Sequence, residues 1–308
     1  MPATRSMHSN SLDERYKAVF FTKWDIESAL AARVVVEEDI TTQNIRTSQL
    51  VAGVASVPKK TEGADISRFS AQQGYATLIT PDTYAMGFCI TEEMFEDDLH
   101  AQADKYPMVL AGLHANTLNT AVFNVFNNAF DSSLQALDTN TGALCATSQA
   151  LSGSSSVGQN RLSTDADLSE TSLEGCIELL VKTVNEDNVY IGGRPSKLVV
   201  SASNWGEARR LTRSTTTTEQ LTGKSGNAIN AVVDAYGMEA PVVSPYLTDA
   251  DAWFILGETS PITLVWRVRP QIKRMGQDSD NGNYYMDVRT RWAVEPTDWR
   301  NIVGTTGA

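Results

Sequence analysis

Residues 91–128, TEEMFEDDLHAQADKYPMVLAGLHANTLNTAVFNVFNN, decide how the rest of the chain is interpreted. Thr91 can cap the start of a helix, and the acids after it suit the positive end of a helix dipole. From Leu99 to Phe126 apolar residues recur close to helical spacing. The pattern predicts a helix over 99–128, about 45 Å long, which Pro107 either kinks or starts afresh. An element of this length indicates a structural strut.

Upstream of this helix the sequence predicts a long two-stranded ribbon. Residues 49–57 and 75–80 are rich in β-branched residues, and a polar segment separates them. An arm of about 18 residues would reach about 50–60 Å, whereas a compact domain of this length has a radius of gyration near ~19 Å. Because an isolated hairpin is marginally stable in water, we expect a neighbouring subunit to support the ribbon.

The remaining segments predict a mixed order of helices and strands. Residues 16–36 suit one amphipathic helix, and 132–167 suit a loop-rich connection. Thr171–Glu174 has capping-box spacing ahead of another helix. Further elements are expected as a helix at 204–211 and strands at 197–201, 242–243, 253–256, 262–266 and 284–292. Without a strand-helix-strand rhythm, this order predicts the α+β class.

Composition narrows the classes of function. The chain has 308 residues, with 25 Lys and Arg against 37 Asp and Glu, for a formal net charge of -12. This balance argues against a protein that grips phosphates, although an acidic lining could lie beside packed DNA. No apolar run reaches about 18 residues, so we expect no membrane span. Three widely spaced cysteines, Cys89, Cys145 and Cys176, indicate reduced thiols rather than a disulfide framework.

Each candidate catalytic or ligand-binding motif lacks a residue or a spacing that its chemistry requires. His8, His100 and His114 lack metal-ligand spacing. Gly223-Lys-Ser225 resembles the end of a phosphate-binding loop, but Thr218 stands where that loop needs glycine. The remaining candidates also fail: 153–158 lacks nucleophile-elbow spacing, 278–282 lacks the closing glutamate of a calcium loop and suits a β-turn, and the acids of 37–39 suit a solvated surface. We therefore expect no catalytic residues, no cofactor and no bound metal.

The order of elements resembles the major capsid proteins of tailed bacteriophages, the Hong Kong ninety-seven fold. Gly87–Asp98 is similar to that family's passage from extended loop to spine helix, and Val199–Trp205 to its axial strand and helix. Tyr284–Trp299 is similar to its aromatic, arginine-bearing C-terminal strand. The resemblance implies an N-terminal arm (1–46), an extended loop or β-ribbon (47–90), a peripheral domain (91–165) with spine helix 99–128, an axial domain (166–262) and returning C-terminal strands (263–308).

The resemblance also implies a function. Hexamers and pentamers of the chain would form an icosahedral shell around double-stranded DNA, without sequence-specific binding, and would assemble in the host cytoplasm into the virion. The implied partners are a separate scaffolding protein, because the arm is short, a portal and, as an optional addition, a decoration protein. The loop 213–226 would lie at the capsomer centre.

Contacts between subunits are expected at the ribbon. We expect Lys59, Lys60 and Arg68 to meet acids of a neighbouring subunit, with Glu92, Glu93 and Glu96 as the candidates. In some relatives an isopeptide bond from a lysine near this tip crosslinks the subunits covalently. A lysine pair that protects a strand edge is the favoured interpretation here.

Three alternatives stay open at this point. A bacterial encapsulin would share the fold but enclose an enzyme. A fibre or decoration protein would be mostly β, which the long helix argues against. An enzyme with a site built from scattered carboxylates would run as a monomer or small oligomer on a sizing column.

Overall fold

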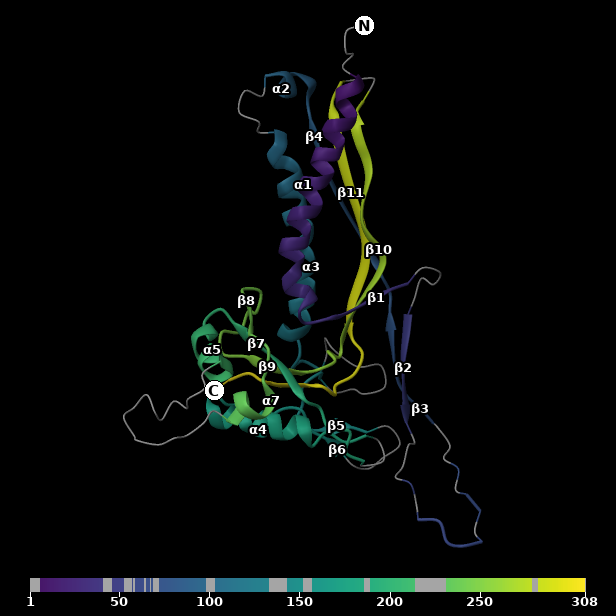
Figure 1. The fold of residues 1–308 in the computed structure, drawn as a ribbon, viewed down its shortest axis with the longest axis vertical. Coiled ribbons are helices and arrows are strands. Elements are labelled where there is room, and N and C mark those ends of the chain that lie inside the picture. The colour runs from purple at the N-terminus through teal and green to yellow at the C-terminus, as the bar shows by residue number, and fades with distance from the viewer. Residues whose placement is uncertain are drawn as a thin grey trace, which may run out of the picture.

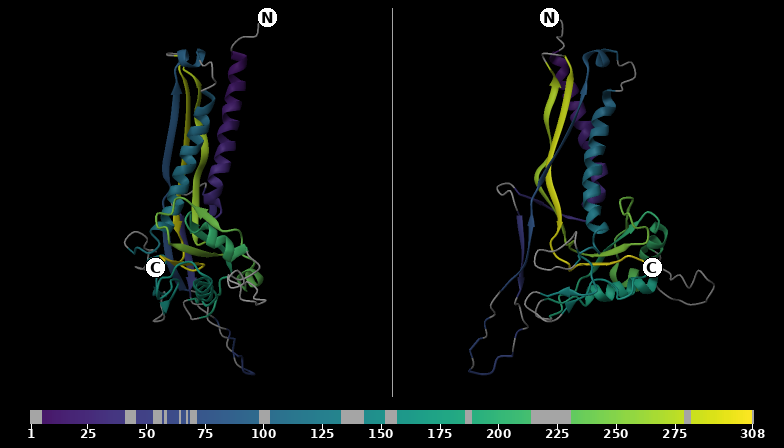
Figure 2. Two further views of the ribbon diagram at one scale, coloured as in Figure 1. Left: turned by 90° about the vertical axis from the view of Figure 1, so that its left-hand side faces the viewer. Right: turned by 180° about the vertical axis from the view of Figure 1, so that it is seen from behind.

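The computed structural model describes residues 6–40, 46–52, 57, 59–63, 65–66, 68, 72–97, 103–132, 143–151, 157–185, 189–213, 231–278 and 282–307. The molecule is elongated: two long helices and a long sheet form a spine, and a second sheet with short helices lies at one end (Figure 1). The side views show that the spine is thin, with the helices in one layer and the sheet in the other (Figure 2). The predicted α+β class is confirmed.

Helix α3, Tyr106–Asn127, is the predicted strut, but it begins later than Leu99. Residues 98–102 lie outside the described part of the chain, and η1, Ala103–Lys105, is a single 3-10 turn. Pro107 stands in the first turn of α3, where a missing N–H breaks no hydrogen bond. Pro107 therefore starts a fresh helix rather than kinking a longer one. The helix contains no Asp, Glu, Lys or Arg.

Helix α1, Ser6–Ala32, lies beside α3 and runs in the same direction (Figure 1). It ends earlier than the predicted residue 36, because the β-branched run that follows turns into strand β1, Val36–Asp39. Buried Asn119 of α3 ties the helices together. Its side-chain oxygen accepts from the Ala31 N–H at 3.2 Å, and its amide nitrogen donates to the Glu27 carbonyl at 2.9 Å. One amide thus sets the position of α1 along α3.

The spine sheet has the strand order β1-β10-β11-β4. β1 runs parallel to β10, Ile262–Gln277, and the hairpin of β10 with β11, Tyr284–Pro296, is antiparallel. Along most of β11 buried residues alternate with partly exposed ones, so one face packs under the helices. β10 continues well past the predicted 262–266. Three register irregularities interrupt its two-residue period, which hides the strand from pattern analysis.

The ribbon is formed by β2, Arg46–Ala52, and β3, Gln72–Ile79, which pair antiparallel as predicted. Strand β4, Asp82–Ile90, is different. The family resemblance placed these residues in the extended loop (47–90), but β4 pairs with β11 in the spine sheet. Only Thr80 and Pro81 separate β3 from β4, so one segment passes from the ribbon into the spine. The division of the chain into five domains stays a prediction.

The second sheet has the order β12-β9-β7-β8, with strands Ile302–Thr305, Trp253–Gly257, Pro195–Ser201 and Val242–Ser244. Helices α4, Glu170–Val181, α5, Trp205–Arg213, and α7, Ala231–Tyr236, accompany it, as does the short pair β5, Gln149–Ala150, and β6, Val157–Gly158. The predicted cap at Thr171 is wrong. Ser169 caps α4, and its side chain and that of Ser172 each accept from the other's backbone N–H.

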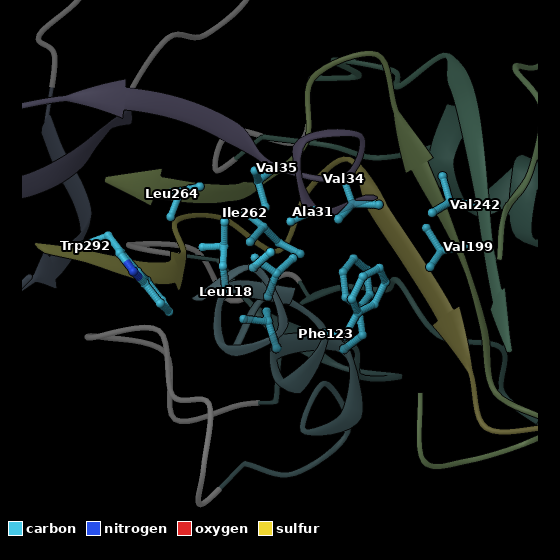
Figure 3. Close-up of a cluster of buried hydrophobic side chains, with 14 of the residues drawn as sticks. Ala31, Val34, Val35, Leu118, Phe123, Val199, Val242, Ile262, Leu264 and Trp292 are labelled. Carbon is cyan, nitrogen blue, oxygen red and sulfur yellow. The ribbon is translucent and has the colours of Figure 1, made fainter. Parts of the chain in front are cut away.

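One buried cluster joins the spine to the second sheet. Figure 3 shows side chains of both helices and both sheets pointing toward one another, with Phe123 of α3 facing Val199 and Val242. Phe123 is fully buried, and its ring lies 5.7 Å from that of Phe126 and 6.0 Å from that of Tyr246. The two ends of the molecule therefore share a core at the foot of α3.

Replacing Phe123 with Ala should lower the free energy of unfolding by about 3–5 kcal/mol, because the cavity would lie where the two sheets meet. Phe21→Ala, on the exposed side of α1, is the matched control and should cost less than about 1 kcal/mol. Chemical denaturation of the free subunit measures both. Equal losses in the two variants would contradict a shared core at Phe123.

Candidate assembly surfaces

The described residues of the ribbon tip are fully open to solvent. Lys59, Lys60 and Arg68 are exposed there, and the Val57 side chain has 95% of its surface accessible. Ile66 is also exposed. Apolar and cationic side chains thus stand together with the acids Glu62 and Asp65 on a projection that touches little of its own subunit, and exposed apolar side chains of this kind are expected of a contact surface.

The acidic candidates lie on α2, Glu92–Glu96, at the opposite end of the molecule (Figure 1). Thr91 caps this helix as predicted, accepting from the Met94 N–H at 3.3 Å. Glu93 is exposed, whereas Glu92 accepts a 3.0 Å hydrogen bond from Gln277. The side chain of Glu96 lies outside the described residues. One subunit therefore does not bring these acids to the ribbon cations, and any such contact needs a second subunit.

The acidic segment of β1 has a role that the sequence pattern did not reveal. Glu37 and Asp39 were interpreted as solvated acids, but Arg269 of β10 binds both. Its guanidinium donates twice to Asp39 at 3.0 Å and once to Glu37 at 3.1 Å, and these carboxylates raise the pKa of Arg269. The Trp266 indole also donates to Glu37, at 3.2 Å. These contacts fasten the parallel strand β1 to β10.

Within the helix layer, α3 presents an uncharged outer surface, whereas α1 carries charged residues such as Lys23 and Glu27. Met108, Val109 and Leu113 of α3 are exposed, and Val109 has 58% of its surface accessible. Val109 and Leu113 line a shallow groove of about 490 Å³ with Leu30 of α1 and Tyr246. Helices that face water normally carry charges on the outer side, so α3 has the surface of a helix that another molecule covers.

The groups with possible chemistry do not form a reactive site. His114 is buried between α1, α3 and β4, and burial lowers its pKa. Burial also raises the pKa of the Cys145 thiol, and that of Cys176 to about 12, so neither is a ready nucleophile. Within the described ranges no cluster of His, Cys, Asp and Glu could hold a metal ion. His100 and the Gly223–Ser225 segment lie outside those ranges, as do most of 213–226, and the His8 side chain is not described.

Crossing a bilayer as a single helix requires both length and apolar character. In the part of the chain that the structure describes, no helix combines the two.

A thin spine, a projecting ribbon and the uncharged outer face of α3 define a subunit built for assembly with others. The family model described as "Phage capsid protein" matches residues 74–304, well over half of the chain, and the chain belongs to this family. No curated protein sequence matches it significantly.

Solved structures agree on the fold. The capsid of the cyanophage P-SCSP1u aligns with a TM-score of 0.59 at 10% identity, over 89% of this chain and 86% of that one. The capsid of a native GTA particle gives 0.55 at 12% identity, over 91% of each chain. A virus-like particle from Pyrococcus furiosus gives 0.52 at 7% identity, over 95% of this chain and 98% of that one.

The protein is thus a structural, non-enzymatic capsid protein of the Hong Kong ninety-seven kind, a virion component that assembles with copies of itself into a shell. The predicted resemblance is confirmed. The encapsulin, fibre and enzyme alternatives are not favoured. The candidate contact residues stay predictions, because they require a second subunit.

Because His114 is buried in the spine, we expect acid to destabilise the subunit. Its pKa is lowered on folding, so the unfolded chain binds the proton more readily and stability falls as pH drops below about 6.5. One such group contributes a slope of at most about 1.4 kcal/mol per pH unit. His114→Gln stays neutral and should flatten the fall. Thermal unfolding of the two subunits between pH 7.5 and 5.5 measures this, and parallel curves would contradict a role for His114.

Proposed function

We propose that hexamers and pentamers of this chain form an icosahedral shell around double-stranded DNA in the virion. Family membership over residues 74–304 carries the proposal. A closed shell needs many weak contacts repeated by symmetry, and the exposed ribbon and uncharged helix face are surfaces of that kind. The net charge of -12 suits a wall that lies beside DNA without holding a particular sequence.

The proposed partners follow from the same role. A separate scaffolding protein would guide assembly in the host cytoplasm, a portal would occupy one vertex, and a decoration protein is an optional addition. Particles purified from infected cells should protect DNA against added nuclease, whatever its sequence. Particles that assemble and never contain protected DNA would remove this part of the proposal.

We also propose that the ribbon of one subunit lies across the next. Lys59, Lys60 and Arg68 would then meet Glu92, Glu93 and Glu96 of the neighbour. The separation of the two groups within one subunit supports this arrangement, since cations at one end and acids at the other can meet only between subunits. An exposed ion pair contributes only about 0.2–1 kcal/mol, but repetition over a shell multiplies each contact.

Charge reversal tests the ribbon contact. Lys60→Glu or Arg68→Glu should lower the yield of shells and their tolerance to salt, measured by sedimentation, because like charges would meet at every contact. The reciprocal variant Glu93→Lys, combined with Lys60→Glu, is the matched control and should recover part of the yield. Shells of unchanged yield and salt tolerance in both single variants would show that these residues do not make the contact.

A further inference from the structure

The two outer edges of the spine sheet differ in how they are protected. In the described part of the chain β1 covers only Thr263–Trp266 of β10, and the rest of that strand contains Pro270, four cationic residues and the register irregularities already described. Proline, charges and bulges are the devices that keep a strand edge from pairing with another chain. The β10 edge is therefore blocked.

The β4 edge has none of these devices. Its nine residues, DTYAMGFCI, contain no Lys, Arg or Pro, and Asp82 at the start is the single charge. Its pairing with β11 runs from Asp82 to Ile90 without a register shift, and among the described residues β4 is the last strand of the sheet on this side. Met86, in the middle, has 52% of its surface accessible. A regular, apolar edge of this length would promote aggregation if it stayed bare.

The uncharged face of α3 adjoins this edge. The Tyr106 ring stacks on Phe88 of β4 at 5.5 Å, and the backbone of Met86 forms a hydrogen bond with His114. Strand β4 and helix α3 thus form one continuous flank of the spine, and the only acid or base with a full charge in these two elements is Asp82. The core of a subunit interface typically contains few charged residues. The flank therefore has the composition of a buried surface.

Apart from its ends, where Asp82 would lie opposite Ile90, the sequence of β4 is complementary to itself, and this favours a second copy of the chain as the molecule that covers the edge. In an antiparallel pair of two copies, only a centre on a residue keeps both helix layers on the same side, and Met86 is the midpoint of the strand. With this centre Tyr84 lies opposite Phe88 of the second copy on the helix side. On the other side Thr83 lies opposite Cys89, and Ala85 opposite Gly87, so small side chains meet small ones.

We propose that β4 pairs antiparallel with β4 of a second copy across a two-fold axis centred on Met86, with the two α3 helices side by side. The spine sheets of two subunits would then continue into each other. This inference rests on the proposed assembly into a shell and adds the contact that joins two subunits symmetrically.

An engineered disulfide tests the register. In the proposed pair, residue 83 of one copy faces residue 89 of the other with Cα atoms about 4.5–5.5 Å apart, within disulfide range. Cys89 is exposed in the native chain, whereas Cys145 and Cys176 are buried. Thr83→Cys should therefore convert most subunits of oxidised shells into disulfide-linked dimers on a non-reducing gel.

Two controls make the result specific. The native chain should stay monomeric on the gel, because its two Cys89 residues would be about 20 Å apart along the strands. Thr83→Cys combined with Cys89→Ser should also stay monomeric. If Thr83→Cys prevents assembly, Met86→Cys with Cys89→Ser replaces it, since residue 86 would face itself and dimers are again expected.

Three outcomes would count against the proposal or its basis. Shells in which neither cysteine variant forms dimers would overturn the two-fold contact and leave the shell function intact. A ladder of trimers and larger products would also overturn it, because a head-to-tail contact, such as a ribbon from a neighbour on this edge, links chains without limit. Failure of the native chain to assemble under any condition would instead contradict the proposed function.

Discussion

Burial of one face of the β10-β11-β4 sheet beneath α1 and α3 is the contact on which the rest of the molecule depends. Aromatic pairs carry it: Tyr16 packs edge-on against Tyr284 at 5.6 Å, and Trp24 against Trp266 at 6.3 Å. A two-layer body this narrow buries one side of each layer and leaves the other side outside. The protein can therefore be long and stiff only by leaving much of its surface to its neighbours.

Polar contacts decide how these layers are aligned. Apolar packing between two helices tolerates sliding, whereas the Asn119 amide fits only one pair of backbone groups on α1. Arg269 has the same effect between β1 and β10, since its planar fork matches Asp39 and reaches Glu37. Alignment matters in a shell subunit because an error at one end of a long spine is carried to every contact at the other.

The distribution of charged residues distinguishes the strand edge that is protected from pairing from the surfaces that are open to contact. The chain is acidic overall, yet β10 carries four cations and no acid, and α3 carries neither. Charged and interrupted strands resist unwanted pairing, as on β10, and uncharged ones permit close approach, as on β4 and α3. The uncharged surface that permits contact in a shell would promote aggregation of the free subunit. We infer that assembly and solubility compete on the β4 flank.

The sequence by itself determined the local elements with strong periodicity. The strut helix, the ribbon strands and the α+β order follow from residue spacing, because helical and strand periods are properties of neighbouring residues. Pro107 marked the possible start of α3 and Thr91 the start of α2 for the same local reason. The failed motifs, such as Thr218 in place of a glycine, likewise excluded known chemistry, since each motif requires particular residues at a fixed spacing.

Only the tertiary structure decided which strands pair and where long elements stop. β4 pairs with β11 in the spine sheet rather than within the ribbon, and Ser169 rather than Thr171 caps α4. Glu37 and Asp39 became partners of Arg269, which is 230 residues from Asp39 in the chain. Pairing and capping depend on what lies across from a residue, and distant segments compete for those positions. A local sequence pattern carries no information about which distant segment wins such a position. The open edge of β4 could therefore be recognised only from the strand order.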